Sequence, residues 1–153
     1  MSNFRPPLRR HPALQPLSRQ HHQALLLAQL LKQDMPDYQG LPDTVEGKLA
    51  YARRLFDTDL AAHFAAEEEE LIPAVRGRDA ELDALCDTIV EEHRALAAAL
   101  EQLEAAEAGE RAALLDALGR LLEAHVRREE RTWFERIQEV VPEDDLQNLN
   151  LKE

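Results

Sequence analysis

Prolines and glycines divide this sequence into four long segments, and this division limits the folds that the chain can adopt. The segments cover about residues 17–35, 43–75, 79–108 and 110–141. All four are rich in Ala, Leu, Glu and Arg, which favour helix, and no segment shows the sustained polar–apolar alternation of a strand. Short connections between long helices predict antiparallel neighbours. We therefore expect an all-α fold, an up-down-up-down antiparallel four-helix bundle.

The two ends of the sequence differ from this helical middle. Residues 1–16 hold four of the eight prolines and predict a flexible Pro-rich arm. Residues 17–142 form the predicted bundle, with Ser18 as a candidate N-cap of its first helix. Residues 143–153, "EDDLQNLNLKE", form a short acidic C-terminal tail.

Each predicted helix carries an apolar stripe in steps of three and four residues, which is the spacing of an inward face. A single histidine interrupts the stripe of the first helix at His21 and that of the third helix at His93. His22 lies one position further round the first helix, in line with leucines and glutamines. Both His21 and His22 are candidates for an inward imidazole, and we prefer His21.

The second and fourth helices place a His-x-x-x-Glu pair on the same inward stripe. The pairs are His63 with Glu67 and His125 with Glu129. Residues four apart lie one turn from each other on one helix face. In an up-down bundle, these pairs and the single histidines of the other two helices converge near one level.

Two inward glutamates require an explanation. Desolvating an ionised carboxylate costs several kcal/mol even after the protein relaxes, and no inward Arg or Lys lies at their level. A bound cation among the imidazoles and carboxylates removes this cost. The sequence therefore predicts a metal site.

The types of ligand restrict the choice of metal. The absence of cysteine ligands disfavours structural zinc, and the mixture of imidazole and carboxylate disfavours calcium and magnesium. Iron and manganese remain. Two six-coordinate ions need about twelve ligand positions, more than these side chains supply. A bridging oxo or hydroxo group, water or an exogenous ligand would fill the rest.

Four phrases in order, "SRQHH", "HFAAEEEELIP", "EEHRAL" and "HVRREE", resemble the hemerythrin-like, or HHE cation-binding, domain over about residues 17–142. The resemblance implies two non-haem iron ions with an oxo or hydroxo bridge, in a four-helix bundle. It also implies carriage of dioxygen, or sensing of oxygen, nitric oxide or iron. By motif position, the implied imidazole ligands are His21 or His22, His63, His93 and His125, and the implied bridging carboxylates are Glu67 and Glu129.

The sequence departs from the oxygen-carrying hemerythrins at two places. Those proteins have His-x-x-x-His on the third helix, whereas His93 has Ile89 and Ala97 at the one-turn offsets. Their last carboxylate is an aspartate five residues after a histidine, whereas Glu129 follows His125 by four. With one imidazole fewer, we expect a protein that binds or senses oxygen, nitric oxide or iron. The alternative is a di-iron enzyme that acts on peroxide or nitrogen oxides.

A ferritin-like oxidase and a catalytic acid–base site are not indicated. Ferritin-like sites use Glu-x-x-His, but the residues three before the inward histidines of helices two to four are Leu60, Val90 and Leu122. No dedicated acid–base constellation is visible, so we assign no catalytic residue.

Overall charge and composition limit the partners. The formal net charge of −12 gives no electrostatic basis for binding nucleic acid. The single cysteine, Cys86, cannot form an internal disulfide, and no apolar run is long enough for a membrane span or signal segment. We expect a cytoplasmic protein whose partner is a small ligand, oxygen, nitric oxide or peroxide, and the sequence does not identify a protein partner.

Some residues near the motifs have ordinary structural roles. Glu68–Glu70 and Glu91–Glu92 are expected to face water, with Glu68 or Glu92 available to accept a hydrogen bond from a ligating imidazole. Trp133 and Phe134 are expected to pack in the core.

Overall fold

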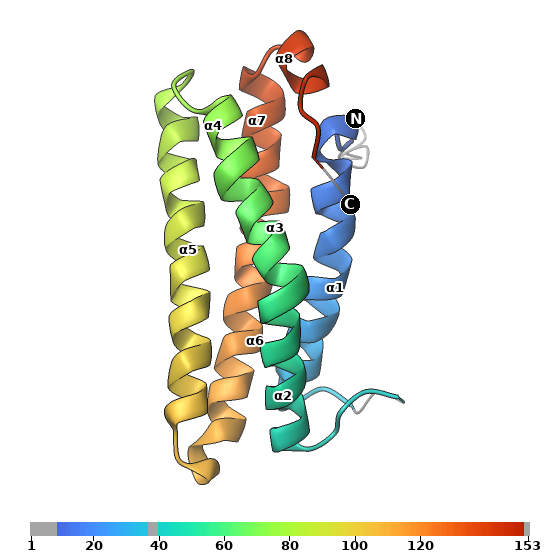
Figure 1. The fold of residues 1–153 in the computed structure, drawn as a ribbon, viewed down its shortest axis with the longest axis vertical. Coiled ribbons are helices and arrows are strands. Elements are labelled where there is room, and N and C mark those ends of the chain that lie inside the picture. The colour runs from blue at the N-terminus through green and yellow to red at the C-terminus, as the bar shows by residue number, and fades with distance from the viewer. Residues whose placement is uncertain (1–8, 37–39, 152–153) are drawn as a thin grey trace, which may run out of the picture.

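The structure is a computed structural model that describes residues 9–36 and 40–151. Every regular element in this part of the chain is a helix, which confirms the predicted all-α fold. Figure 1 shows that the long helices run side by side along the long axis of the molecule, and that successive ones run in opposite directions.

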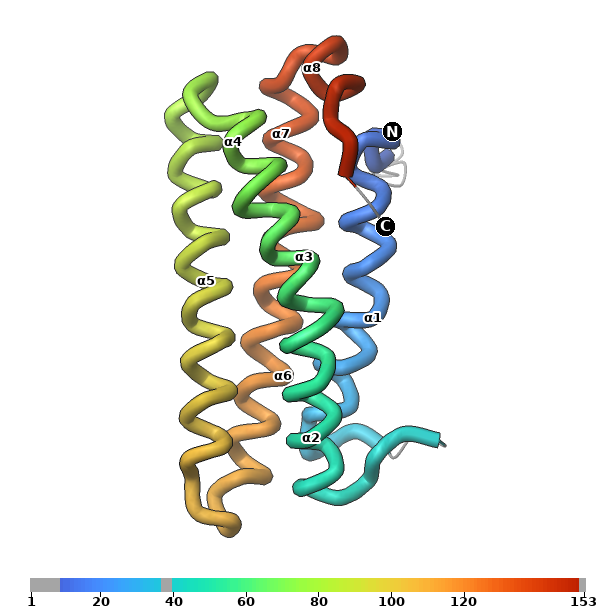
Figure 2. Tube along the Cα trace, viewed as in Figure 1, coloured from blue at the N-terminus to red at the C-terminus, as the bar shows by residue number. Residues whose placement is uncertain are grey.

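Two of the four rods are single helices and two are interrupted. The single helices are α1 (Gln15–Leu31) and α5 (Ala80–Ala105). The second rod, residues 45–75, comprises α2 (Val45–Leu55), a π-helical turn (Phe56–Leu60), α3 (Ala61–Ala66), a second π-helical turn (Glu67–Leu71) and α4 (Ile72–Val75). The fourth rod, residues 111–140, comprises α6 (Arg111–Arg128), a π-helical turn (Glu129–Trp133) and α7 (Phe134–Val140). In the tube of Figure 2 both rods continue through these turns without a break.

Short helices complete the described chain. Single 3₁₀ turns cover Pro12–Leu14 and Ala108–Glu110, and α8 covers Glu143–Gln147. The prediction that Ser18 caps the first helix is wrong. Helix α1 begins earlier, at Gln15, because the fixed φ of Pro16 suits the first helical turn. The Ser18 hydroxyl lies inside the helix and donates to Glu130 Oε2 at 2.7 Å.

The described parts of the predicted arm and tail pack on the bundle. Leu14, Leu146 and Leu151 are buried in the apolar cluster at the end of the bundle that holds α7. The guanidinium of Arg10 lies over the Phe134 ring at 5.2 Å. Apolar and cation–π contacts therefore hold residues 9–16 against the bundle, whereas the sequence predicts a flexible arm there. Residues 1–8 lie outside the described residues.

The apolar core is divided in two. One cluster fills the lower end of the bundle in Figure 1 and includes Leu27, Leu96 and Leu118. The other fills the upper end and includes Leu17 and Ile89, and also Trp133 and Phe134, as the sequence predicts. A layer of buried histidines and glutamates lies at the level between these clusters.

One glycine lets two helices meet closely. A Cβ atom on Gly119 would lie 2.6 Å from the carbonyl oxygen of Ala28 and 3.1 Å from the Cβ of Leu31. Only glycine at this position allows the backbones of α1 and α6 to approach each other so closely. This contact draws α1 against the fourth rod, which carries Glu129.

No helix in the described ranges is both long and apolar enough to cross a membrane.

Candidate metal centre

The polar layer of the core contains the predicted site residues with one exception. The side chains that meet there, all buried, are His21, His63, His93, His125, Glu67 and Glu129. His22 is exposed and takes no part in the cluster. One residue corresponds to about 100° of rotation in an α-helix, which turns the His22 side chain away from the bundle axis.

One group of ligand atoms comes from α1 and the second rod, together with Glu129. The Nε2 atoms of His21 and His63 lie 3.1 Å apart. His21 Nε2 lies 2.7 Å from Glu129 Oε1, and His63 Nε2 lies 3.1 Å from Glu67 Oε2. All four residues can place one donor atom within 4.8 Å of the others.

The second group comes from α5 and the fourth rod, together with Glu67. His93 Nε2 lies 2.9 Å from Glu67 Oε1, and His125 Nε2 lies 3.1 Å from Glu129 Oε2. Glu67 and Glu129 thus belong to both groups, and each turns one oxygen toward each pair of histidines. Such an arrangement of donor atoms could hold two cations that share two carboxylates.

The buried donor atoms fit cations better than they fit one another. Glu67 Oε2, Glu129 Oε2 and His125 Nε2 are buried without a hydrogen-bond partner. His125 Nε2 is close to Glu129 Oε2, but the contact lacks the direction of a hydrogen bond. At a metal–nitrogen distance of about 2.1 Å, two ligands at right angles lie about 3.0 Å apart. The separation of 3.1 Å between His21 Nε2 and His63 Nε2 agrees with that spacing.

The second nitrogen of each imidazole, Nδ1, is held by another side chain. Glu68 Oε2 accepts from His93 at 2.6 Å, and Glu92 Oε1 accepts from His125 at 2.8 Å. The sequence analysis names Glu68 or Glu92 as such an acceptor, and in the structure both accept a hydrogen bond from an imidazole. With a proton on Nδ1, the Nε2 lone pair is directed to the centre, where it can bind a cation.

The other two acceptors were not predicted. Glu130 Oε2 accepts from His21 Nδ1 at 2.8 Å, and Gln20 Oε1 accepts from His63 Nδ1 at 2.7 Å. A sequence signal exists for them, because every acceptor directly precedes or follows a site residue of its own helix. Each acceptor then serves a histidine of a neighbouring rod, so the four bonds form a ring around the bundle.

The buried carboxylates keep the imidazoles basic. Burial lowers the pKa of His63 and His93, but Glu67 and Glu129 outweigh it and raise the pKa of each to about 10. His125 responds in the same way, with a pKa raised to about 9, and the pKa of His21 is also raised. Burial raises the pKa of Glu129, but the surrounding imidazoles hold it well below its ordinary value. Cation binding must therefore displace protons from these imidazoles.

Both shared glutamates stand at the start of a π-helical turn. The N–H of Ile72 donates to the carbonyl of Glu67, and the N–H of Phe134 donates to the carbonyl of Glu129, five residues back in each case. Pro73 contributes to the turn that begins at Glu67, because it has no N–H for a regular helical hydrogen bond. The turn that begins at Glu129 has no proline within it or directly after it. Wide turns of this kind are frequent at functional sites.

Comparison with known families gives one match. Residues 13–137 match the family described as the hemerythrin HHE cation binding domain. No curated protein and no solved structure match the chain.

Proposed function

The chain belongs to the hemerythrin HHE cation binding domain family, and on this premise we propose that it is a non-haem di-iron protein that binds or senses oxygen or nitric oxide. The observation that supports the proposal most strongly is the sharing of Glu67 and Glu129 by two buried groups of histidines. His21 and His63 would hold one iron. His93 and His125 would hold the other.

When bound, the two irons would supply redox chemistry and coordination positions that the six side chains leave free. The chain's own residues orient and enclose the centre. The acceptors on Nδ1 fix the imidazole orientations, and the Phe64 ring stacks on His93 with centroids 3.9 Å apart. The two apolar clusters lie above and below the centre and limit the access of water.

Binding or sensing is favoured over catalysis because the nearby carboxylates already hold imidazoles. Glu68, Glu92 and Glu130 each accept a hydrogen bond from one of them. A proton donor for peroxide chemistry would have to break such a bond.

Metal analysis of protein purified from iron-replete cells tests the proposal. We expect about two irons per chain, because two groups of donors share the carboxylates. Zinc at one per chain, or manganese in place of iron, would overturn the di-iron assignment.

Reactivity separates the candidate functions. Azide or nitric oxide added to the iron-loaded protein should produce new charge-transfer absorption, and His93→Ala should reduce that response because it removes a ligand of one iron. His11→Ala is the control, since His11 pairs with Glu143, away from the centre. Sustained consumption of peroxide would favour the enzyme. Repeated cycles of oxygenation without net oxidation would favour oxygen carriage.

A further inference from the structure

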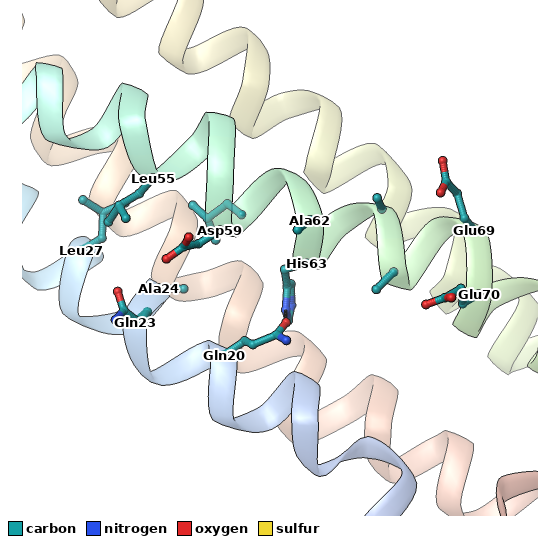
Figure 3. Close-up of a pocket in the computed structure, with 13 residues that line it drawn as sticks. Gln20, Gln23, Ala24, Leu27, Leu55, Asp59, Ala62, His63, Glu69 and Glu70 are labelled. Atoms are coloured by element: carbon teal, nitrogen blue, oxygen red, sulfur yellow. Dashed lines mark hydrogen bonds between the residues drawn. The ribbon is translucent and has the colours of Figure 1, made fainter. Parts of the chain in front are cut away.

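A cleft with a volume of about 600 Å³ lies between α1 and the second rod, beside the metal centre (Figure 3). His63 and Gln20 form its wall midway along its length. Pockets of about 300–1,000 Å³ typically hold organic ligands. The cleft is therefore much larger than a diatomic gas requires.

The inner surface of the cleft is mainly apolar. Ala24, Leu27 and Leu60 line it and are buried, and Ala62 lines it nearer the solvent. Such a surface favours an aliphatic or aromatic group, because contact removes apolar area from water.

The charged groups around the cleft have one sign. Figure 3 shows the Asp59 and Glu70 carboxylates on either side of His63, directed toward the space between the helices, whereas Glu69 points away. None of the described residues that line the cleft is a lysine or an arginine. The α1 side contributes the amides of Gln20 and Gln23. This distribution repels anions and attracts cations.

We propose that the cleft binds a small organic cation, a protonated amine carried on an apolar chain or ring. The apolar body lies against Ala24, Leu27 and Leu60, and the ammonium group meets Asp59 or Glu70. This inference goes beyond the proposed function and does not depend on which metal the centre holds, because it rests on the shape and charge of the cleft. A bound amine would lie against His63.

Calorimetric titration of the metal-loaded protein with three matched probes tests the proposal. The probes are 4-phenylbutylammonium, the neutral alcohol 4-phenylbutanol and the anion 5-phenylpentanoate. We expect the ammonium compound to bind at least tenfold more tightly than the alcohol, and the carboxylate to bind most weakly. Equal affinity of the three, or no binding of the ammonium compound, would overturn the proposal.

Variants locate the binding. Ala62→Phe should fill the cleft and weaken the binding of the ammonium compound at least tenfold. Ala98→Phe, at an exposed position on α5, should leave this affinity unchanged. The double variant Asp59→Asn and Glu70→Gln should bind the ammonium compound and the alcohol with similar affinity, whereas Glu91→Gln on α5 should keep the preference. A preference that survives the double variant would overturn the proposal. Loss of metal loading in that variant, with amine binding unchanged, would instead indicate a path for inorganic cations.

Discussion

The metal centre has two halves with the same ligand types and different surroundings. The His21–His63 half and the His93–His125 half each contribute two imidazoles, and both use Glu67 and Glu129. The four imidazoles are similarly buried. By ligand count alone, the two halves are equivalent.

Their neighbours make them different. In the His93–His125 half, both Nδ1 atoms donate to carboxylates, and the Phe64 ring stacks on His93 and meets His125 edge-on. In the His21–His63 half, Phe134 stacks on His21 and Phe64 meets His63 edge-on, but the His63 Nδ1 donates to the neutral amide of Gln20, and His63 lines the open cleft.

This difference in the residues around the ligands predicts that two positions with equal ligand counts bind metal differently. An anionic acceptor makes an imidazole a stronger donor than an amide acceptor does. We therefore expect the His93–His125 half to bind its metal more firmly and the His21–His63 half to meet exogenous ligands first.

The largest effect should come from removing what the halves share. Glu67→Ala should lower the iron content from about two per chain to one or none, because Glu67 contributes an oxygen to each half. The measurement is metal analysis after purification. Glu69→Ala is the matched control, since Glu69 is exposed in the same acidic run. Equal iron contents in the two variants would contradict the shared role.

Alkaline pH should affect both halves of the metal-free protein. The pKa values of His63 and His93, about 10 each, lie above the ordinary value of 6.5. Their protonation therefore contributes stability that is complete below pH 6.5 and is lost as pH rises toward 10. We expect the Tm of the metal-free protein to fall by on the order of 10 °C between pH 7 and 10.

Calorimetry with and without metal provides the control for this pH effect. The metal-loaded protein should lose less stability, because metal replaces the protons. His63→Gln and His93→Gln should flatten the pH dependence of the metal-free protein equally. Unequal flattening would show that the halves differ in basicity as well as in surroundings.

Phe64→Ala should make the halves more alike in access. Loss of the ring uncovers His93 and His125, so azide should bind to the His93–His125 half more readily. A spectroscopic titration should show this binding as a second phase. Loss of apolar contacts should also reduce the free energy of unfolding by about 2 kcal/mol. A single unchanged phase would mean that Phe64 does not limit access.

The smallest effect should come from Gln20→Glu, which makes the hydrogen bonding of the halves alike. A carboxylate on His63 Nδ1 should slow metal release from the His21–His63 half by up to about tenfold. Stopped-flow chelation by a chromophoric chelator measures this rate. Gln23→Glu on α1 is the control, since Gln23 lines the cleft without a hydrogen bond to His63.

The sequence predicts the residues of the centre because ligands buried in a helical bundle must follow the helical period. The stripe through His21 favours it over His22, and His21 is the buried one of the two; the pair His63–Glu67 identifies an inward face. Gln20 and Glu130 were missed, and the partner histidine of none of the four acceptors was predicted, because these hydrogen bonds cross between rods. Such bonds depend on the axial register of two helices, which the spacing within one helix does not determine.

The π-helical turns were also missed, although the stripes contain a signal for them. The inward positions of the fourth rod run in successive steps of four through His125, Glu129, Trp133 and Ile137, all buried. Each step of four overshoots a regular turn of 3.6 residues by about 40°. Three such steps cannot stay on one face of a regular α-helix, so the run itself indicates a wide turn.

The wide turns have a consequence for any attempt to regularise this protein. Forcing residues 129–133 into regular α-helical geometry, with no residue removed, would rotate the rest of the fourth rod by about 100°. The ligands before the turn and the apolar stripe after it could then no longer face inward together. Each wide turn thus keeps the two parts of its rod in register, so that both the ligands and the apolar side chains face the inside of the bundle. Deleting exposed Arg131 or Thr132 removes the extra residue of the turn and keeps this phase, so we expect it to be tolerated better than a deletion within a regular α-helical segment.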